Sequence, residues 1–400
     1  MKTLILNWKN GENDPFSVLN RAIERHFRAC GKQTEILQIT DAQWAGQVAE
    51  ALAGGVDFVY TWQGIGSTAR VNDTGESFWD RVRVPLVCVH GDHPAHMPAN
   101  HQLDSRHCFH LYTNADFARY ANRHFRRLRS AAVIDIPQLF FEPQVASFTG
   151  EHFVVIKNVD DPAVQQAHWR QTLDGRTAAA YLAAAEALTA RLLAGGYVEI
   201  HDVLDGLIDE EAWQWLAPAN DARAYHAYHS ALDFYVRSWK SIAAVAALAD
   251  FPLHVYGRGW DRLAQRAPAH HRYFAGRAMA DTAPLYASRY GLVDVSPSKL
   301  LHDRTRRAMV LGTAFLSSAN LEDRLPGFEC HAPLFYDFRP GELAAKCAAV
   351  VAAPQAHVER CRTFAREYHD TFHFRRFVDR LDELARSVDR QVAPAAGASA

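Results

Sequence analysis

The stretch LVDVSPSKLLHDRTRRAM, residues 292–309, combines a short apolar strand with the start of a basic helix. The strand ends near Asp294, and the chain leaves it through Ser-Pro-Ser. The polar residues that follow predict a helix that begins near His302. Free backbone N–H groups at a helix start, with a cation such as Arg304 beside them, are suited to bind a phosphate. A solvated basic helix is the competing interpretation.

Apolar, strand-like runs alternate with helical patterns on both sides of this stretch. In the first 140 residues the runs are 3–8, 35–39, 56–62, 85–90, 108–112 and 132–136. A second series follows at 253–256, 272–274, 292–295, 314–317 and 334–338. This alternation predicts two mostly parallel sheets that are covered by helices.

The chain length also indicates two domains, because 400 residues with 48% apolar types exceed what one hydrophobic core usually holds. We expect an α/β protein with two Rossmann-like domains that face a central cleft. Residues 1–228 would form the first domain, with a helical insertion at about 163–216. Residues 229–390 would form the second domain, and 391–400 a flexible tail. Ligands of such sheets bind at the carboxyl ends of the strands.

Composition excludes several classes of protein. Lys and Arg number 43 against 45 Asp and Glu, which leaves a formal charge of −2 and no basic face for general nucleic-acid binding. The six cysteines are scattered without a C-x-x-C pair and indicate reduced thiols in a cytoplasmic protein. No window approaches the roughly 18 uncharged apolar residues of a membrane helix, so no transmembrane segment is expected.

Two more strand ends in the second half carry glycine. HVYGRGW, residues 254–260, runs from a strand into a turn with Gly257 and Gly259, and YFAGR, residues 273–277, ends in glycine and a cation. Missing side chains allow a ligand to approach the backbone closely. An ordinary turn explains either motif equally well when it stands alone.

Taken in order, these segments resemble the glycosyltransferase group 1 superfamily, and more closely its CgeB-like branch. The branch pattern is Tyr-Gly-x-Gly-Trp, then Tyr-Phe-x-Gly, then His-x-Arg with a later Ala-Met and Gly. It is matched at 256–260, 273–276 and 302–312. The late segment YHDTFHFRR, residues 368–376, is similar to the branch's His-Thr-Tyr-x-x-Arg helix. The resemblance covers about residues 230–390 and implies a GT-B fold.

The resemblance implies that the second domain binds a nucleotide-activated sugar as co-substrate, with no further cofactor. The implied donor-binding residues are Tyr256, Gly257 and Arg258 near the sugar or diphosphate, Gly276 and Arg277 around the nucleobase, and Ser298, His302, Asp303 and Arg304 around the diphosphate and sugar. Arg307 departs from the family pattern, because many group 1 enzymes have a Glu there that holds the ribose hydroxyls. A cation cannot accept those hydrogen bonds, so another acceptor, an unusual donor or a loss of donor binding is implied.

The most polar strand end of the first half is VCVHGDHPAH, residues 87–96. A carboxylate and imidazoles at the end of a buried strand are well placed for proton transfer. Asp92 is the first candidate for a general base that deprotonates an acceptor hydroxyl, and His93 is the second. The segment loosely resembles the Asp-x-Pro strand end of the branch's acceptor domain. A role of Asp92 in capping the turn at Pro94 is the alternative.

Closely spaced histidines in the same region raise the question of a metal. The six are His90, His93, His96, His101, His107 and His110. Imidazoles are common zinc ligands, but the segment has no His-Glu-x-x-His and no cysteine pair, and the chain has 21 histidines in all. We therefore expect no bound metal. GT-B proteins in general need none, since a helix end and basic residues neutralise the diphosphate.

The sequence thus predicts a metal-independent glycosyltransferase that moves a sugar from a nucleotide-activated donor to a hydroxyl of a protein or glycan acceptor. The alternative is a non-catalytic GT-B-like binding partner of a glycosylation system, which Arg307 favours. A general base is needed only if the reaction inverts the anomeric centre. The residues leave open the donor base, the sugar, the acceptor, the stereochemistry and the oligomeric state.

Overall fold

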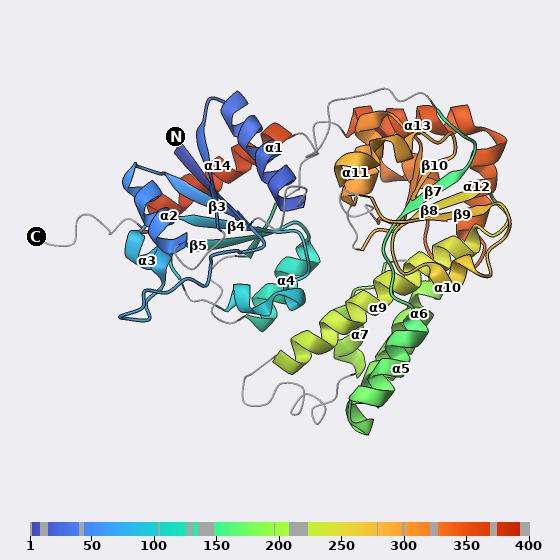
Figure 1. Ribbon diagram of the computed structural model, residues 1–400, viewed down its shortest axis with the longest axis horizontal. Helices are drawn as coiled ribbons and strands as arrows, with labels where there is room; N and C mark the ends of the chain where they lie inside the picture. Colours follow the sequence, from blue (N-terminus) through green and yellow to red (C-terminus); the bar gives the residue numbers. More distant parts are fainter. Residues whose placement is uncertain are drawn as a thin grey trace, which may run out of the picture. The chain divides into compact units, whose positions relative to one another are not determined.

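The computed structural model describes residues 2–8, 15–39, 44–102, 105–125, 131–134, 148–195, 197–207, 223–277, 279–297, 301–320, 327–368 and 374–392. They form two compact units (Figure 1). The first unit is Met1–Phe140 with Asp370–Ala400, and the second is Phe141–His369. Each unit is a parallel sheet with helices around it, so the predicted α/β class with two Rossmann-like domains is confirmed.

The first unit contains a six-stranded sheet in the order β2-β1-β3-β4-β5-β6, and all its neighbours pair in parallel. Its strands are β1 (Lys2–Asn7), β2 (Gln33–Gln38), β3 (Phe58–Trp62), β4 (Leu86–His90), β5 (Cys108–Tyr112) and β6 (Ala131–Val133). Its helices are α1 (Pro15–Ala29), α2 (Trp44–Ala53), α3 (Phe78–Val82), η1 (Pro94–His96), η2 (Pro98–His101), α4 (Ala115–His124) and α14 (Phe374–Val392).

The last helix, α14, belongs to the core of this first unit. Phe377, Val378 and Leu381 are buried in the same cluster as Ile5 and Tyr60. The central strands β3 and β4 are buried at every residue, as parallel strands between two layers of helices are. The C-terminal helix therefore closes the sheet that the N-terminal residues begin.

The second unit contains a five-stranded parallel sheet in the order β11-β10-β7-β8-β9. Its strands are β7 (Phe153–Ile156), β8 (Leu253–Tyr256), β9 (His271–Phe274), β10 (Gly291–Asp294) and β11 (Phe315–Ser317). Its helices are α5 (Pro162–Thr172), α6 (Gly175–Ala194), α7 (Ile200–Leu207), α9 (Arg223–Ala247), α10 (Asp261–Ala264), η4 (Met279–Tyr286), α11 (Asp303–Leu311), η5 (Phe328–Leu334), α12 (Glu342–Ala352) and α13 (Pro354–Glu367). The strand order reverses between β7 and β10.

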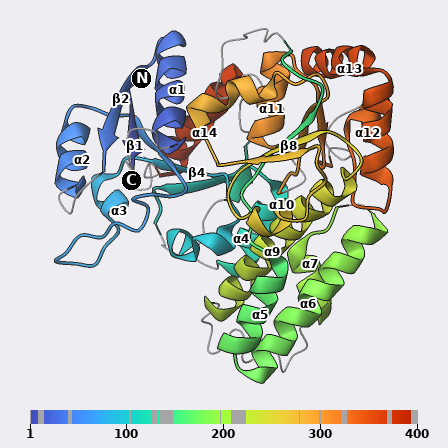
Figure 2. The ribbon, with the colours of Figure 1, turned by 45° about the vertical axis from the view of Figure 1, so that its right-hand side comes forward.

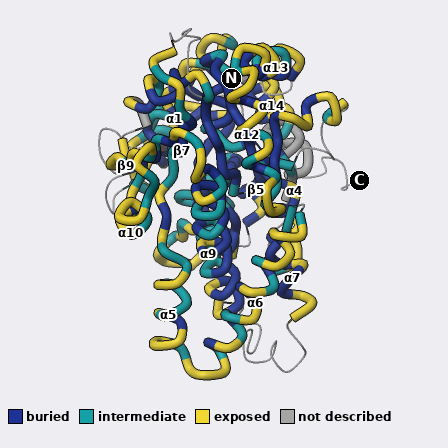
Figure 3. Tube along the Cα trace, turned by 90° about the vertical axis from the view of Figure 1, so that its right-hand side faces the viewer, coloured by how far each residue is buried: buried dark blue, intermediate teal, exposed yellow. Residues whose placement is uncertain are grey.

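Helices α5, α6 and α7 pack with α9 into a helical group that extends from the second sheet (Figure 2). Helix α9 is buried at many positions, whereas Trp169 is the buried residue of α5 (Figure 3). No helix in the described ranges has the length and apolar character that a membrane crossing requires.

The boundary between the units corrects the sequence-based expectation. The chain passes from the first unit to the second at residues 140–141 rather than 228–229, and the helices within 163–216 belong to the second unit. The reason is β7, which pairs in parallel with both β8 and β10 and so lies inside the second sheet. Residues 370–392 return to the first unit instead of closing the second.

Candidate functional site

The second sheet changes strand order between β7 and β10, and doubly wound sheets bind ligands at the carboxyl ends of the strands at such a point. Lys157 follows β7 directly, and Ser296 follows β10 by two residues. Helix α9 lies against both strand ends, because Lys240 Nζ donates to the Ser296 carbonyl oxygen at 2.5 Å and Ser238 Oγ accepts from the Asp160 amide at 3.2 Å. The switch point is therefore lined by residues of β7, β10 and α9.

Four cations gather at this point: Lys157, Arg237, Lys240 and Arg304. Burial, followed by the positive charges of Arg304 and Arg237, holds the pKa of Lys157 well below its ordinary value. Burial lowers the pKa of Lys240 to about 8, against the opposing effect of Asp233. Like charges this close destabilise one another unless an anion lies among them.

The two arginines have carboxylate partners, and the two lysines do not. Arg237 Nη2 lies 2.7 Å from Asp233 Oδ2, and Arg304 Nε lies 2.8 Å from Asp294 Oδ1. Within the described ranges neither lysine forms an ion pair with a carboxylate. Lys240 instead contacts the Ser296 carbonyl and lies 5.4 Å from the ring centre of Phe338. The cluster therefore carries uncompensated positive charge.

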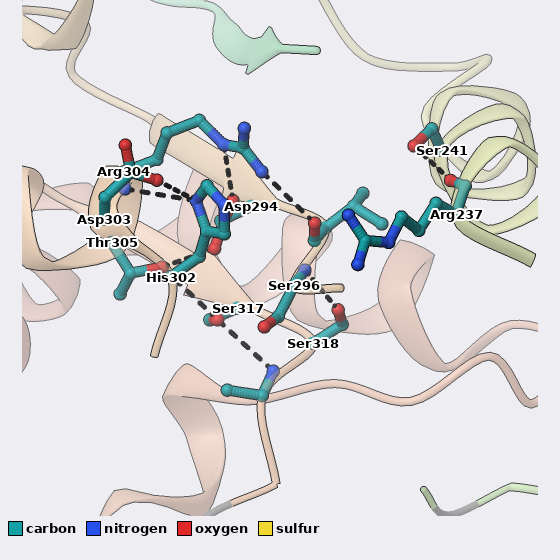
Figure 4. A network of polar contacts seen from close by, with 12 residues as sticks. Arg237, Ser241, Asp294, Ser296, His302, Asp303, Arg304, Thr305, Ser317 and Ser318 are labelled. Atoms are coloured by element: carbon teal, nitrogen blue, oxygen red, sulfur yellow. Dashed lines mark hydrogen bonds and ion pairs between the residues drawn. The ribbon is translucent and has the colours of Figure 1, made fainter. Parts of the chain in front are cut away.

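Asp294 holds Arg304 in place (Figure 4). One carboxylate oxygen accepts from Arg304 Nε, and the other accepts from Thr305 Oγ1 at 2.7 Å. Burial acts to raise the pKa of Asp294, but the positive charge of Arg304 and these hydrogen bonds outweigh it and leave the pKa below its ordinary value. Arg304 Nη2 also donates to the Val295 carbonyl at 3.3 Å. The guanidinium of Arg304 is thus fixed beside the end of β10.

Helix α11 begins at Asp303, as the sequence predicts, and His302 caps its first turn. His302 Nδ1 accepts from the Arg304 amide at 3.4 Å and also contacts the Asp303 carboxylate. Burial, followed by the charge of Arg304, lowers the pKa of His302. The imidazole thus takes one of the N–H groups that the sequence assigned to an anion, so the positive side chains are the stronger part of the site.

The glycines of 254–260 have another role than the one expected from the sequence. A Cβ atom on Gly257 would lie 2.0 Å from the Lys157 carbonyl oxygen, and one on Gly259 would lie 1.8 Å from the Val159 carbonyl oxygen. The space on the Cβ side of these glycines is filled by the chain's own backbone. Trp260 Nε1 also donates to the Lys157 carbonyl at 2.7 Å. The motif therefore positions Lys157.

The remaining predicted donor residues lie mostly on the neighbouring strand ends. Tyr256 ends β8 and stacks on Phe274, with ring centres 4.7 Å apart. Arg258 and Arg277 have exposed side chains. A Cβ atom on Gly276 would lie 3.8 Å from the Gly257 Cα, so the loops after β8 and β9 are adjacent. Ser298 lies outside the described residues.

Arg307, which stands where the family resemblance implies a Glu, is buried. It donates to Thr282 Oγ1, and its guanidinium carbon lies 5.5 Å from the ring centre of Tyr286. Burial lowers the pKa of Arg307, while Tyr286 and Asp303 act in the other direction. This arginine is an internal contact between α11 and η4 and not a solvated surface cation.

In the first unit Asp92 follows β4 and is held by Gln63, whose Nε2 donates to Asp92 Oδ2 at 2.6 Å. Gln63 has a left-handed backbone with φ 55°, which is uncommon outside glycine. The cap of η1 is His93, whose Nδ1 accepts from the Ala95 amide at 3.2 Å. Asp92 therefore does not cap the Pro94 turn. His93 is buried against Tyr120, with ring centres 4.4 Å apart.

Three of the six closely spaced histidines come together in the first unit: His90, His101 and His110. His107 bonds to Asp80 instead, with 2.9 Å between Nδ1 and Oδ1. Irregular spacing in the sequence hid this grouping, because the pairing of β4 with β5 brings His90 close to His110 and the short helix η2 adds His101.

Sequence reasoning missed Lys157, Arg237 and Lys240. Lys157 directly follows an apolar run, and the two α9 residues are three apart, so both signals were present in the sequence. Neither signal is specific, because a lysine after a strand and cations three apart on a helix are common on protein surfaces. Assigning residues 1–228 to the first domain removed Lys157 from consideration.

Comparisons with known proteins find likeness in structure and none in sequence. No protein-family model matches the chain, and no curated protein matches its sequence. A solved structure of an alpha-glucosyltransferase in complex with UDP and a 13-mer DNA containing a HMU base superposes with a TM-score of 0.45 and 8% sequence identity. The superposition covers 95% of this chain and 98% of that chain. A likeness at this level assigns neither a ligand nor a residue role to this chain.

Proposed function

We propose that this protein is a glycosyltransferase and that its second unit binds the diphosphate of a nucleotide-activated sugar. The cation cluster at the β7–β10 switch point supports the proposal, since Lys157 and Lys240 form an ion pair with no carboxylate in the described part of the chain. A diphosphate supplies negative charge and several acceptor oxygens, and its bonds to cations are stronger than neutral hydrogen bonds. A bound anion would also raise the pKa of both lysines toward the ordinary value.

In this proposal Lys157 and Lys240 contact diphosphate oxygens, while Arg237 and Arg304 add charge from positions set by their carboxylates. Asp303 and His302, at the start of α11, would lie around the diphosphate and the sugar. The sugar would lie near Ser298 and His302. The nucleobase would lie at the loops after β8 and β9, where Tyr256, Gly257, Arg258, Gly276 and Arg277 are found. Four cations at one point make a metal ion unnecessary for neutralising the diphosphate.

The proposed reaction breaks the bond between the anomeric carbon and the diphosphate oxygen and forms a bond from that carbon to an acceptor hydroxyl oxygen of a protein or glycan. The nucleoside diphosphate leaves with the electron pair of the broken bond. If the configuration inverts, Asp92 takes the hydroxyl proton as general base. Gln63 holds the Asp92 carboxylate for this step, and His93 is the weaker candidate because its ring is buried as a cap.

A non-catalytic binding partner is the second candidate, because Arg307 replaces the Glu that the resemblance implies. Arg307 contacts Thr282 and Tyr286 and so packs inside the second unit. Both candidates predict nucleotide binding if the cation cluster is a ligand site. Only the enzyme releases nucleoside diphosphate from a nucleotide sugar in the presence of an acceptor.

The test is calorimetric titration with a panel of nucleoside diphosphates, followed by turnover assays with the corresponding nucleotide sugars. Lys157→Gln should weaken diphosphate binding by about 10- to 100-fold, the usual cost of a lost charge-assisted bond. Arg289→Gln is the matched control, since Arg289 is an exposed cation of the same unit that pairs with Glu151. If no diphosphate binds, or if the lysine variant binds as the wild type does, the proposal fails.

A further inference from the structure

The three gathered histidines lie on neighbouring elements of the first unit. His90 ends β4, His110 is in the middle of β5, and His101 ends η2. Their exposed fractions are only 1%, 2% and 1%. One ring nitrogen from each lies within 4.8 Å of those of the other two. Three potential ligand atoms therefore surround one small buried volume.

Contacts among the rings show how tightly they are held. His90 Nε2 lies 2.9 Å from His110 Nδ1, and the ring centres of His90 and His101 are 4.3 Å apart. The Tyr112 hydroxyl lies 2.7 Å from His101 Nδ1 and orients that ring. Parallel pairing puts Tyr112 directly opposite His90. The pairing of β4 with β5 thus brings His90 and His110 together, η2 adds His101, and the Tyr112 hydroxyl orients the His101 ring.

Burial favours the neutral form of His90 and His110. Burial, followed by the neighbouring His101 and His110, holds the pKa of His90 well below its ordinary value. Burial lowers the pKa of His110 to about 4. A neutral imidazole keeps a lone pair on one ring nitrogen, and this is the form that binds metals. No proton needs to be removed near neutral pH before a metal can bind.

We propose that His90, His101 and His110 bind one Zn²⁺ ion through one ring nitrogen each, with water as the fourth ligand. Imidazole ligands suit zinc and copper, whereas calcium and magnesium prefer oxygen. Three histidines with an open fourth position form a known zinc arrangement. Zinc–nitrogen bonds of about 2.0–2.1 Å at tetrahedral angles require nitrogens about 3.4 Å apart. The distance between His90 Nε2 and His110 Nδ1 would increase by about half an ångström, and longer distances between the ligand nitrogens would decrease.

This ion would stabilise the region around Asp92. Asn100, next to His101, donates to the Gln63 carbonyl at 2.7 Å, and Gln63 in turn holds Asp92. A Cβ atom on Gly64 would lie 2.9 Å from His90 Cε1, so the backbone after β3 runs against the same imidazole. Zinc at the cluster is therefore a positioning element for the end of β4 and lies outside the unit to which we assign the donor.

The test begins with wild-type protein purified without an affinity tag and stripped with a chelator. We expect it to bind one Co²⁺ per chain, with the visible spectrum of a four-coordinate ion, and to exchange it for Zn²⁺. Zinc should raise the melting temperature, since it binds only the folded protein. X-ray absorption should report nitrogen ligands of the imidazole type. Failure of the wild type to bind either ion in a one-to-one ratio overturns the proposal.

Variants locate the ion. His101→Gln and His110→Gln should each weaken Zn²⁺ binding by more than about 100-fold, and Tyr112→Phe by about 10-fold through loss of the ring-orienting bond. His96→Gln is the matched control, because His96 is a half-buried histidine of the same segment outside the cluster. Equal losses in His96→Gln and His110→Gln would place the metal elsewhere and overturn the assignment. Should a cluster variant fail to fold, the Tyr112→Phe and His96→Gln comparison still decides.

Discussion

Lys240 is a buried ammonium group whose pKa is lowered to about 8, mainly by burial. An unfolded lysine titrates near 10.4, so between about pH 8 and pH 10 the unfolded chain holds more protons than the folded one. The contribution of Lys240 to the free energy of unfolding therefore rises with pH across this window. Urea unfolding measures the free energy of unfolding of ligand-free wild type and of Lys240→Met. As the pH rises across this window, the difference between the two should change in favour of the wild type, by no more than about 3 kcal/mol.

If the free energies of unfolding of wild type and Lys240→Met differ by the same amount at about pH 7 and about pH 10, the lowered pKa of Lys240 is contradicted. The comparison with the variant is needed because other buried groups titrate at high pH. Burial raises the pKa of Cys361 to about 12, for example, and that contribution is common to both proteins.

In the reaction that we propose, Asp92 is the general base if the configuration inverts. Asp92→Asn keeps the size of the side chain and can still bond to Gln63, so the protein should fold normally. Its affinity for the donor should stay within about twofold of the wild-type value. Turnover should fall by about 10²- to 10⁴-fold, the usual contribution of a general base. Steady-state kinetics, followed by the release of product, separate an effect on turnover from an effect on donor affinity. Unchanged turnover would assign the proton transfer to another group or the reaction to a retaining mechanism.

At the level of single elements, the loop after β8 supports the position of Lys157. Gly259 has φ +86°, and a Cβ atom there would overlap the Val159 carbonyl oxygen. Gly259→Ala should lower the free energy of unfolding by more than about 2 kcal/mol and weaken diphosphate binding through the displaced loop. Gly341→Ala is the control, because Gly341 has φ +82° and nothing within 4 Å of its Cβ position.

Thermal unfolding and calorimetric titration of the two glycine variants measure these effects. Gly341→Ala measures the loss of stability that the left-handed backbone alone causes. The additional loss in Gly259→Ala therefore measures the overlap of the new Cβ atom with the Val159 carbonyl oxygen. If the two variants lose equal stability and neither loses affinity, the loop after β8 does not position Lys157.

Elements whose signals are local could be predicted from the sequence. Alternating apolar runs indicated the two sheets, and the start of α11 at Asp303 followed from the residues around it. Partners that are distant in the sequence could not be predicted. The assignment of β7 depends on its pairing with β8 and β10, about 100 and 140 residues away. Lys157 and the histidine cluster were misjudged for the same reason.

The helix α14 ties the C-terminal residues to the first unit. Leu381 is fully buried in the cluster that contains Ile5 and Phe377. Leu381→Ala should destabilise the first unit by about 2–5 kcal/mol, the usual cost of a cavity in a core. The second unit does not contain this cluster, so its affinity for nucleoside diphosphates should be unchanged.

Differential scanning calorimetry and titration of Leu381→Ala check both parts of this prediction. Leu193→Ala provides the control, because Leu193 is 43% exposed and lies in α6 of the second unit. Equal loss of stability in the two variants would mean that α14 does not belong to the core of the first sheet.

The return of α14 also bears on the order in which the protein matures during synthesis. Domains usually fold as units from the N-terminus while the ribosome is still adding residues. Here the apolar cluster around Ile5 and Tyr60 is not complete until Phe377 and Leu381 have been made. The second unit, Phe141–His369, is therefore the first that can fold to completion, although it follows most of the first unit in the sequence. Until then the early sheet exposes an apolar face, and this interval is when a nascent chain of this kind most needs a chaperone.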